Sequence, residues 1–185
     1  GSAMSAAIVV DWKPRLSASF PASIGGPFAM TTHDGRRLTD VDLRGKPYAI
    51  FFGFTQCPDV CPTSMLEVAH LLEALGSDAD KIRFLFVTVD PERDTPDLLR
   101  DYLSSFDKRI VGLRGTPEET ANIVRAYRVF YSKVPTREDY TINHTATMYL
   151  MAADGRFAKT IAFGEDEKTR LRKVRDLIAA ANPAS

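Results

Sequence analysis

The chain of 185 residues has neither a long hydrophobic run nor an excess of charge of one sign. Its uninterrupted apolar stretches, such as residues 6–10 and 49–52, are far shorter than the roughly 20 residues that a membrane-spanning helix needs. Lysine plus arginine and aspartate plus glutamate both total 24, so the formal net charge is zero. No overall field would therefore attract nucleic acid or anionic lipid. We expect the chain as given to be soluble and not to bind nucleic acid.

Cysteine is also scarce, with only Cys57 and Cys61 in the whole chain. Two cysteines are too few for a small domain that is held together by disulfides. A bridge between them would close a very short loop and remove little chain entropy, so a purely structural disulfide is the weaker interpretation. We expect the pair to have a chemical role.

The length and composition predict one folded unit. A chain with 44% hydrophobic residues can bury a substantial core, but 185 residues are too few for two comfortable domains. Residues 1–4 (GSAM) resemble the remnant of a cleaved tag, so a signal or anchor could have preceded them. We expect residues 1–24 to be this remnant and a lead-in segment, and residues 25–182 to be a single domain.

Apolar patterns and turn residues predict the secondary structure. Asp-Gly pairs at 34–35 and 154–155 indicate two β-hairpins. Residues 48–54 have no polar face, which is typical of a buried central strand. Other strands are expected at 82–89, 110–113, 146–151 and 157–163, and helices near 61–75, 96–106, 117–127 and 168–181. Thr95 is expected to cap one helix, and Thr116 with Glu119 to form a capping box at another. Residues 132–140 are polar and are expected to be irregular.

The order of these elements predicts the fold class. Strands and helices alternate early in the chain, which implies right-handed crossovers and parallel strands, whereas the late hairpin adds antiparallel strands. We therefore predict an α/β protein with a thioredoxin-like fold, a mixed central sheet, an N-terminal hairpin and peroxiredoxin-like insertions.

The two cysteines lie in a predicted strand-to-helix turn. Proline is tolerated in the first helical turn, so Pro62 predicts a helix start close to Cys61. Cysteines four residues apart can bring both sulfurs to the same side of one turn. The positive end of the helix should lower the thiol pKa from its usual value of about 8.5 and favour the thiolate. Such a pair suits both disulfide exchange and metal binding.

A histidine could complete a metal site. Two thiolates and one neutral imidazole form a set that suits copper in either oxidation state, whereas zinc normally takes a fourth ligand. His144 is the best candidate, because it follows the polar segment and precedes an apolar strand; a hydrogen-bonded structural histidine is the alternative. His33, in a turn, and His70, on a charged helix face, are expected to be solvated. Asp90 ends the neighbouring strand and would support the cysteines only indirectly, since residues 90–94 are typical of a turn and cap.

Four blocks of sequence resemble the Sco (SenC/PrrC) family in the right order. They are FGFTQCPDVCPTS at 52–64, VDPERDTP at 89–96, AYRVFY at 126–131 and DYTINHT at 139–145. The resemblance extends from about residue 25 to residue 163. It implies a thioredoxin-like copper-binding domain in which one copper ion, Cu(I) or Cu(II), is held by Cys57, Cys61 and His144.

The same resemblance implies a copper metallochaperone. Its partner would be the copper domain of cytochrome c oxidase subunit II, whose binuclear copper centre it would help to assemble. Other periplasmic copper chaperones and thioredoxin-like reductants are further candidate partners. The protein would lie at the periplasmic face of the bacterial inner membrane or in the mitochondrial intermembrane space, touching the membrane only through an N-terminal anchor.

Two positions depart from the family pattern. Asn143 stands where the family commonly has aspartate, so carboxylate support of the imidazole from that position is missing. Gln56 stands where a histidine or another polar residue is common, and we expect it to tune copper binding without abolishing it.

Two other functions use the same cysteines. A thiol-disulfide reductase that keeps the target cysteines reduced would have Cys57 and Cys61 as its catalytic pair, so enzyme activity is left open. A peroxiredoxin-type peroxidase is less well supported. Its reactive cysteine usually follows a threonine by three positions, whereas Thr55 precedes Cys57 by two.

Overall fold

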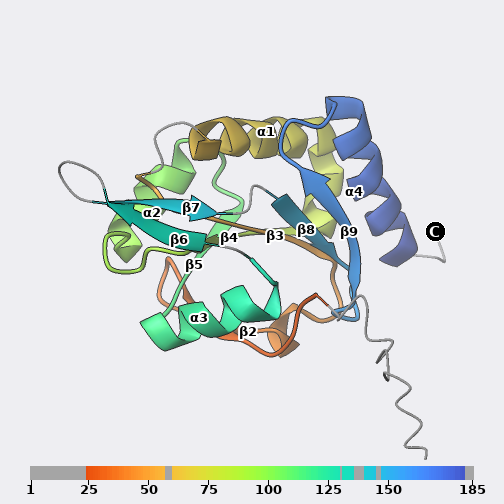
Figure 1. Ribbon diagram of the computed structural model, residues 1–185. Helices are drawn as coiled ribbons and strands as arrows, with labels where there is room; N and C mark the ends of the chain where they lie inside the picture. The colour runs from red at the N-terminus through yellow and green to blue at the C-terminus, as the bar shows by residue number, and fades with distance from the viewer. Residues whose placement is uncertain (1–23, 57–59, 130, 136–139, 145–146, 182–185) are drawn as a thin grey trace, which may run out of the picture.

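Figure 1 shows the computed structural model, which describes residues 24–56, 60–129, 131–135, 140–144 and 147–181. Its helices are α1 (Val60–Leu75), α2 (Pro96–Ser104), α3 (Pro117–Ala126) and α4 (Glu167–Ala181), with short 3₁₀ helices η1 (Val41–Leu43) and η2 (Gly76–Lys81). Its strands are β1 (Ala29–Thr32), β2 (Arg37–Thr39), β3 (Tyr48–Gly53), β4 (Arg83–Thr88), β5 (Ile110–Arg114), β6 (Tyr131–Pro135), β7 (Tyr140–His144), β8 (Thr147–Met151) and β9 (Phe157–Ala162). None of the helices in the described ranges has both the length and the hydropathy of a membrane span.

Seven of the described strands form one mixed sheet in the order β2-β1-β5-β4-β3-β8-β9. The central pairs β3·β4 and β4·β5 are parallel, whereas β1 pairs with β5, and β8 with β3, in the antiparallel sense. All six residues of β3 are buried, as expected for a strand that is covered on both faces. The predicted mixed sheet is confirmed, and so are its N-terminal hairpin β1–β2 and its late hairpin β8–β9.

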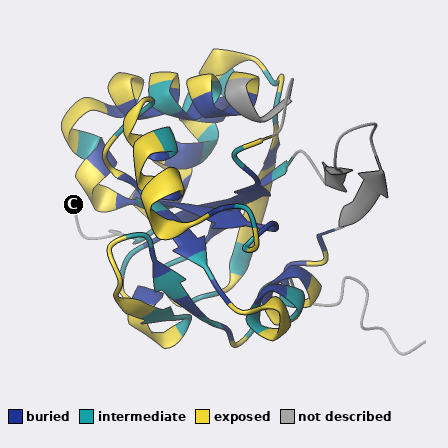
Figure 2. Ribbon diagram, turned by 90° about the vertical axis from the view of Figure 1, so that its left-hand side faces the viewer, coloured by how far each residue is buried: buried dark blue, intermediate teal, exposed yellow. Residues whose placement is uncertain are grey.

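The two faces of the sheet carry separate hydrophobic cores. Successive side chains of a strand point to opposite faces, so Ile50 and Phe52 enter one core and Ala49 and Phe51 the other. The first core is closed by α3, which contributes Ile123, and the second by α1, α2 and α4. Helices therefore lie above and below the sheet in Figure 1, and Figure 2 shows buried strands between helices whose outer surfaces are exposed.

The helix starts follow the predicted capping signals. The Thr95 side-chain oxygen accepts a hydrogen bond from the backbone N–H of Leu98, 3.2 Å away, at the start of α2. Thr116 and Glu119 form a reciprocal capping box at the start of α3. The first helix ends at Leu75, and Gly76 then takes a positive φ of 56°, which glycine adopts without steric cost. Local sequence determines these boundaries.

The expectation of an irregular segment at 132–140 was wrong for residues 132–135 and 140, which lie in strands; residues 136–139 lie outside the described residues. β6 and β7 form an antiparallel pair there, with register Tyr131↔His144 to Pro135↔Tyr140, separate from the seven-stranded sheet. The polar residues made the segment resemble a loop, but a strand needs a hydrogen-bonding partner in register more than an apolar face. Here β6 and β7 supply that partner for each other, and β-branched residues such as Val134 and Ile142 suit the extended backbone.

Candidate metal centre

Residues 54–61, which we call the cysteine loop, connect the end of β3 to the first turn of α1, as the sequence predicts. Cys61 is in the first turn of α1, which begins at Val60. The first N–H groups of a helix have no intrahelical acceptor, and they give this end a partial positive charge that favours a thiolate. Cys57 lies outside the described residues. The predicted strand-to-helix position is thus confirmed for Cys61.

His144 is the last residue of β7, where it pairs with Tyr131 of β6. This strand belongs to the separate two-stranded sheet, so His144 and Cys61 come from elements that are far apart in the sequence. Asn143, the position that departs from the family pattern, pairs with Ser132 in the same ladder. The meeting of Cys57, Cys61 and His144 around one metal ion stays a prediction.

The other two histidines differ from each other. His70 lies exposed on α1, as expected. His33 is half-buried, and its Nδ1 accepts a hydrogen bond of 3.0 Å from the backbone N–H of Gly112, so the expectation of a solvated side chain was wrong. The two residues are 79 positions apart and meet because β1 and β5 are neighbours in the sheet. His33 therefore has a structural role.

A buried carboxylate supports the start of the cysteine loop. Asp94 is fully buried in the loop between β4 and α2. Its Oδ1 accepts a hydrogen bond from the Thr55 hydroxyl at 2.6 Å, and its Oδ2 accepts from the Thr55 backbone N–H at 3.1 Å and from the Thr88 hydroxyl at 2.6 Å. Burial raises the pKa of Asp94 above its ordinary value, although the hydrogen bonds from Thr55 and Thr88 oppose this rise.

The sequence predicts at most an indirect role near the cysteines for Asp90, and this stays a prediction because Cys57 lies outside the described residues. The contact with Thr55 is made by Asp94, which sequence reasoning did not single out. Asp90 is 1% exposed and forms an ion pair with Arg93, whose side chain is 14% exposed. The Arg93 guanidinium also lies over the ring of Phe54, 5.9 Å from its centre. Arg93, held by Asp90, therefore packs against Phe54, the residue directly before Thr55. A second aspartate in the loop after a buried strand was the available sign that Asp94 could support the neighbouring strand end.

Arg114 of β5 holds the same loop from the other side. Its Nε donates to the backbone carbonyl oxygen of Asp94 at 2.9 Å, and its Nη2 donates to that of Pro91 at 2.9 Å. Because β3, β4 and β5 are parallel neighbours, their carboxyl ends meet at one edge of the sheet. The loop after β4 is thus fixed between the ends of its two neighbours.

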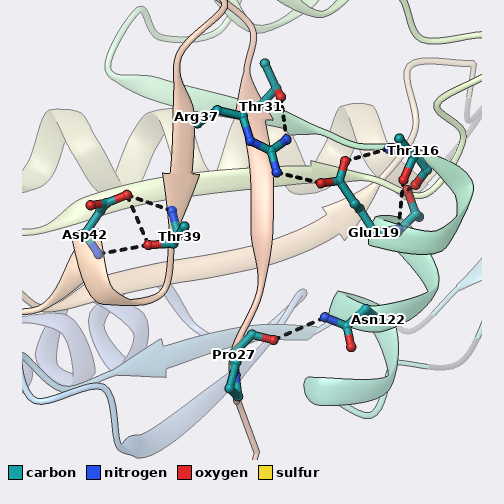
Figure 3. A network of polar contacts seen from close by, with 9 residues as sticks. Pro27, Thr31, Arg37, Thr39, Asp42, Thr116, Glu119 and Asn122 are labelled. Atoms are coloured by element: carbon teal, nitrogen blue, oxygen red, sulfur yellow. Dashed lines mark hydrogen bonds and ion pairs between the residues drawn. The ribbon is translucent and has the colours of Figure 1, made fainter.

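An open pocket of about 450 Å³ lies next to this loop, lined in part by Pro91, Glu92 and Arg114. Its charged groups already have partners: Arg37 Nη2 donates to Glu119 Oε2 at 2.6 Å, and Glu119 Oε1 accepts from the Thr116 backbone N–H at 3.0 Å (Figure 3). The hydrogen bond from Arg37, followed by that from Thr116, lowers the pKa of Glu119.

Comparisons with known proteins match the chain across most of its length. A family model described as SCO1/SenC matches residues 17–179. The human mitochondrial protein described as a SCO1 homolog is 42% identical over 149 residues, which are 78% of this chain and 49% of that protein. The chain belongs to the SCO1/SenC family. It spans about half the length of the curated relatives that it matches.

Solved structures of the family share the fold. The structure of Bradyrhizobium japonicum ScoI with copper bound has a TM-score of 0.79 at 48% identity and covers 84% of this chain and 99% of its own. Yeast Sco1 with copper bound has a TM-score of 0.79 at 37% identity, with coverage of 88% and 92%. The predicted thioredoxin-like fold is confirmed. The structure of BsSco, which shares the fold at 21% identity, is described as that of a member of the Sco family of cytochrome c oxidase assembly proteins.

Proposed function

We propose that this SCO1/SenC protein is a copper metallochaperone whose site consists of the thiolates of Cys57 and Cys61 and the imidazole of His144. It would carry one copper ion and assist assembly of the binuclear copper centre of cytochrome c oxidase subunit II. The observation that carries this proposal is the copper found in two solved relatives that match this chain at 48% and 37% identity. The position of Cys61 in the first turn of α1 agrees with it.

The donor set fits copper as cargo. Thiolates are soft ligands that select Cu(I), and imidazole also suits Cu(II), so the three residues can hold either oxidation state. The amino terminus of α1 favours the ionised form of the Cys61 sulfur without adding a ligand. A site with three protein ligands leaves a position open, and a ligand from the target could enter there before the chaperone ligands leave.

The place of action and the extent of the folded unit belong to the same proposal. We infer that residues 25–182 act as a single copper-binding domain. The target is a copper domain that faces the bacterial periplasm or the mitochondrial intermembrane space. An N-terminal anchor would keep the protein at that membrane.

Copper titration of the reduced protein tests the ligand set. The wild-type chain should bind one equivalent of Cu(I). His144→Ala removes one of three direct ligands, so it should weaken binding by more than the roughly tenfold to hundredfold that loss of an outer-shell partner costs. His70→Ala is the matched control, because His70 is exposed on α1 and has no proposed contact with copper. Equal affinities for the two histidine variants would remove His144 from the site.

A thiol-disulfide reductase is the second candidate, and the position of Cys61 at a helix start favours it. In that function the cysteines pass two electrons to a target disulfide and become a disulfide themselves. Replacing His144 distinguishes the two functions, because copper binding needs it and disulfide reduction does not. With an oxidised target peptide, His144→Ala should keep reductase activity if the redox role is independent, whereas Cys61→Ser should lose it. Loss of activity in both variants would contradict an independent reductase.

A further inference from the structure

We propose that Asp94 is a positioning residue for the cysteine pair. By holding Thr55 it fixes the point at which the chain leaves β3 for Cys57. It thereby sets the separation of the Cys57 and Cys61 sulfurs. That the bound metal is copper rests on the proposed function. The positioning of the two cysteines by Asp94 does not depend on which metal they bind.

The contact between Asp94 and Thr55 fixes both the main chain and the side chain of Thr55. One carboxylate oxygen accepts from the Thr55 backbone N–H and the other from its hydroxyl, at 3.1 Å and 2.6 Å. A two-oxygen contact of this kind restrains both rotation and translation of the residue, which a single hydrogen bond cannot do. Thr55 is therefore a fixed point immediately after β3.

Asp94 is itself held in place. The Thr88 hydroxyl donates to it at 2.6 Å, and its backbone N–H donates to the carbonyl oxygen of Asp90 at 2.9 Å. Arg114 donates to its carbonyl oxygen at 2.9 Å from β5. Contacts on both its side chain and its main chain make Asp94 a rigid support, because a buried, fully satisfied polar network has one preferred arrangement.

The cysteine loop is thus anchored at both ends. Two peptide units separate Thr55 from Cys57, so their Cα atoms lie within about 7 Å of each other. At the far end Cys61 is fixed in the first turn of α1. Holding the two ends raises the effective concentration of one sulfur near the other, which favours any state that needs both, a disulfide or a shared metal ion.

Loosening the first anchor should weaken both states together. We expect Asp94→Asn to lower the equilibrium constant for forming the Cys57–Cys61 disulfide against glutathione by about tenfold, which raises the reduction potential by about 30 mV. Cu(I) affinity should fall by a similar factor. Thr55→Val should reproduce both changes because it removes the hydroxyl, and Thr55→Ser should restore wild-type values because it keeps the hydroxyl.

Two controls separate positioning from general stability. Asp97→Asn removes an exposed carboxylate on α2. Ile161→Val destabilises the core that contains neither Phe52 nor Phe54, from the edge strand β9, two strands away from β3. Both should leave the disulfide equilibrium within about twofold of wild type. If Asp94→Asn does not fold, the comparison of Thr55→Val with Thr55→Ser decides.

The outcomes distinguish this inference from the proposed function. A wild-type chain that binds no copper would overturn the metallochaperone proposal, while a tenfold disulfide shift in Thr55→Val would still support positioning by Asp94. Folded Asp94→Asn and Thr55→Val proteins whose disulfide equilibrium matches that of wild type would overturn the positioning role. The same conclusion would follow if Ile161→Val shifted the equilibrium as much as they do.

Discussion

Two carboxylates of this chain have pKa values shifted in opposite directions for different reasons. Asp94 is fully buried and has a raised pKa because desolvation outweighs its hydrogen bonds. Glu119 is partly exposed and has a lowered pKa because Arg37 and the Thr116 backbone donate to it. The capping box of Glu119 was predictable from its spacing to Thr116. Its bond to Arg37 was not, because 82 positions separate the two residues.

The lowered pKa of Glu119 predicts a pH-dependent contribution to stability. A carboxyl whose pKa falls on folding stabilises the folded state above its unfolded pKa of 4.5, and this contribution disappears as the pH falls through the lowered value. Glu119→Gln keeps the cap acceptor but not the charge. It should therefore lower the free energy of unfolding at pH 7, and the difference from wild type should shrink as the pH falls below 4.5 and through the lowered pKa. Urea unfolding at a series of pH values measures it; a difference that does not shrink as the pH falls would contradict the prediction.

At the scale of elements, short signals determine where helices begin, and pairing across the chain determines which segments become strands. α2 and α3 begin where their caps predict. β6 forms although residues 132–140 are polar and were expected to be irregular, because β7 supplies its hydrogen-bonding partner. Helix starts were therefore predictable from a few neighbouring residues, whereas this hairpin was not.

The N-cap of α2 offers a direct measurement at this scale. Thr95→Ala removes the oxygen that accepts from Leu98 and should cost about 1 kcal/mol in the free energy of unfolding. Thr95→Ser keeps that oxygen and should remain close to wild type. Chemical denaturation followed by circular dichroism gives both values, and equal stabilities for the alanine and serine variants would show that the cap contributes nothing.

At the scale of the whole molecule, one sheet joins two cores. Ile123 lies in the core under α3, and Ile161 of β9 lies in the core under α1, α2 and α4. The strands between them belong to both cores, so loss of either core should unfold the sheet that the other needs.

This arrangement predicts that the protein unfolds in one cooperative transition and that mutations in the two cores have additive effects on the free energy of unfolding. Ile123→Val and Ile161→Val should each cost about 1 kcal/mol, and the double variant should cost their sum within about 0.5 kcal/mol. Circular dichroism and tyrosine absorbance should report the same denaturation midpoint for every variant. Separate midpoints for the two probes would contradict a single domain.

The proposed metal site predicts a second effect on the whole molecule. Its ligands come from the α1 end of the cysteine loop and from β7, so copper would join two separate elements. At a free Cu(I) concentration one hundred times Kd, binding should raise the free energy of unfolding by about 2.7 kcal/mol. A chelator should reverse the gain, and calorimetry should show no comparable gain for His144→Ala; full stabilisation of that variant would locate the copper elsewhere.

The sequence by itself determined the chemistry of the candidate site and the element around it. Cys57 and Cys61 follow a strand with no polar face, and Pro62 predicts a helix start, so neighbouring residues were enough to place Cys61 in a strand-to-helix turn. The tertiary structure alone decided that Asp94, and not Asp90, holds Thr55. The neighbouring residues in the sequence do not show which of the two aspartates in this loop would contact Thr55. The choice depends on which of them points toward the end of a parallel strand 39 positions away, and only the packed sheet fixes that direction.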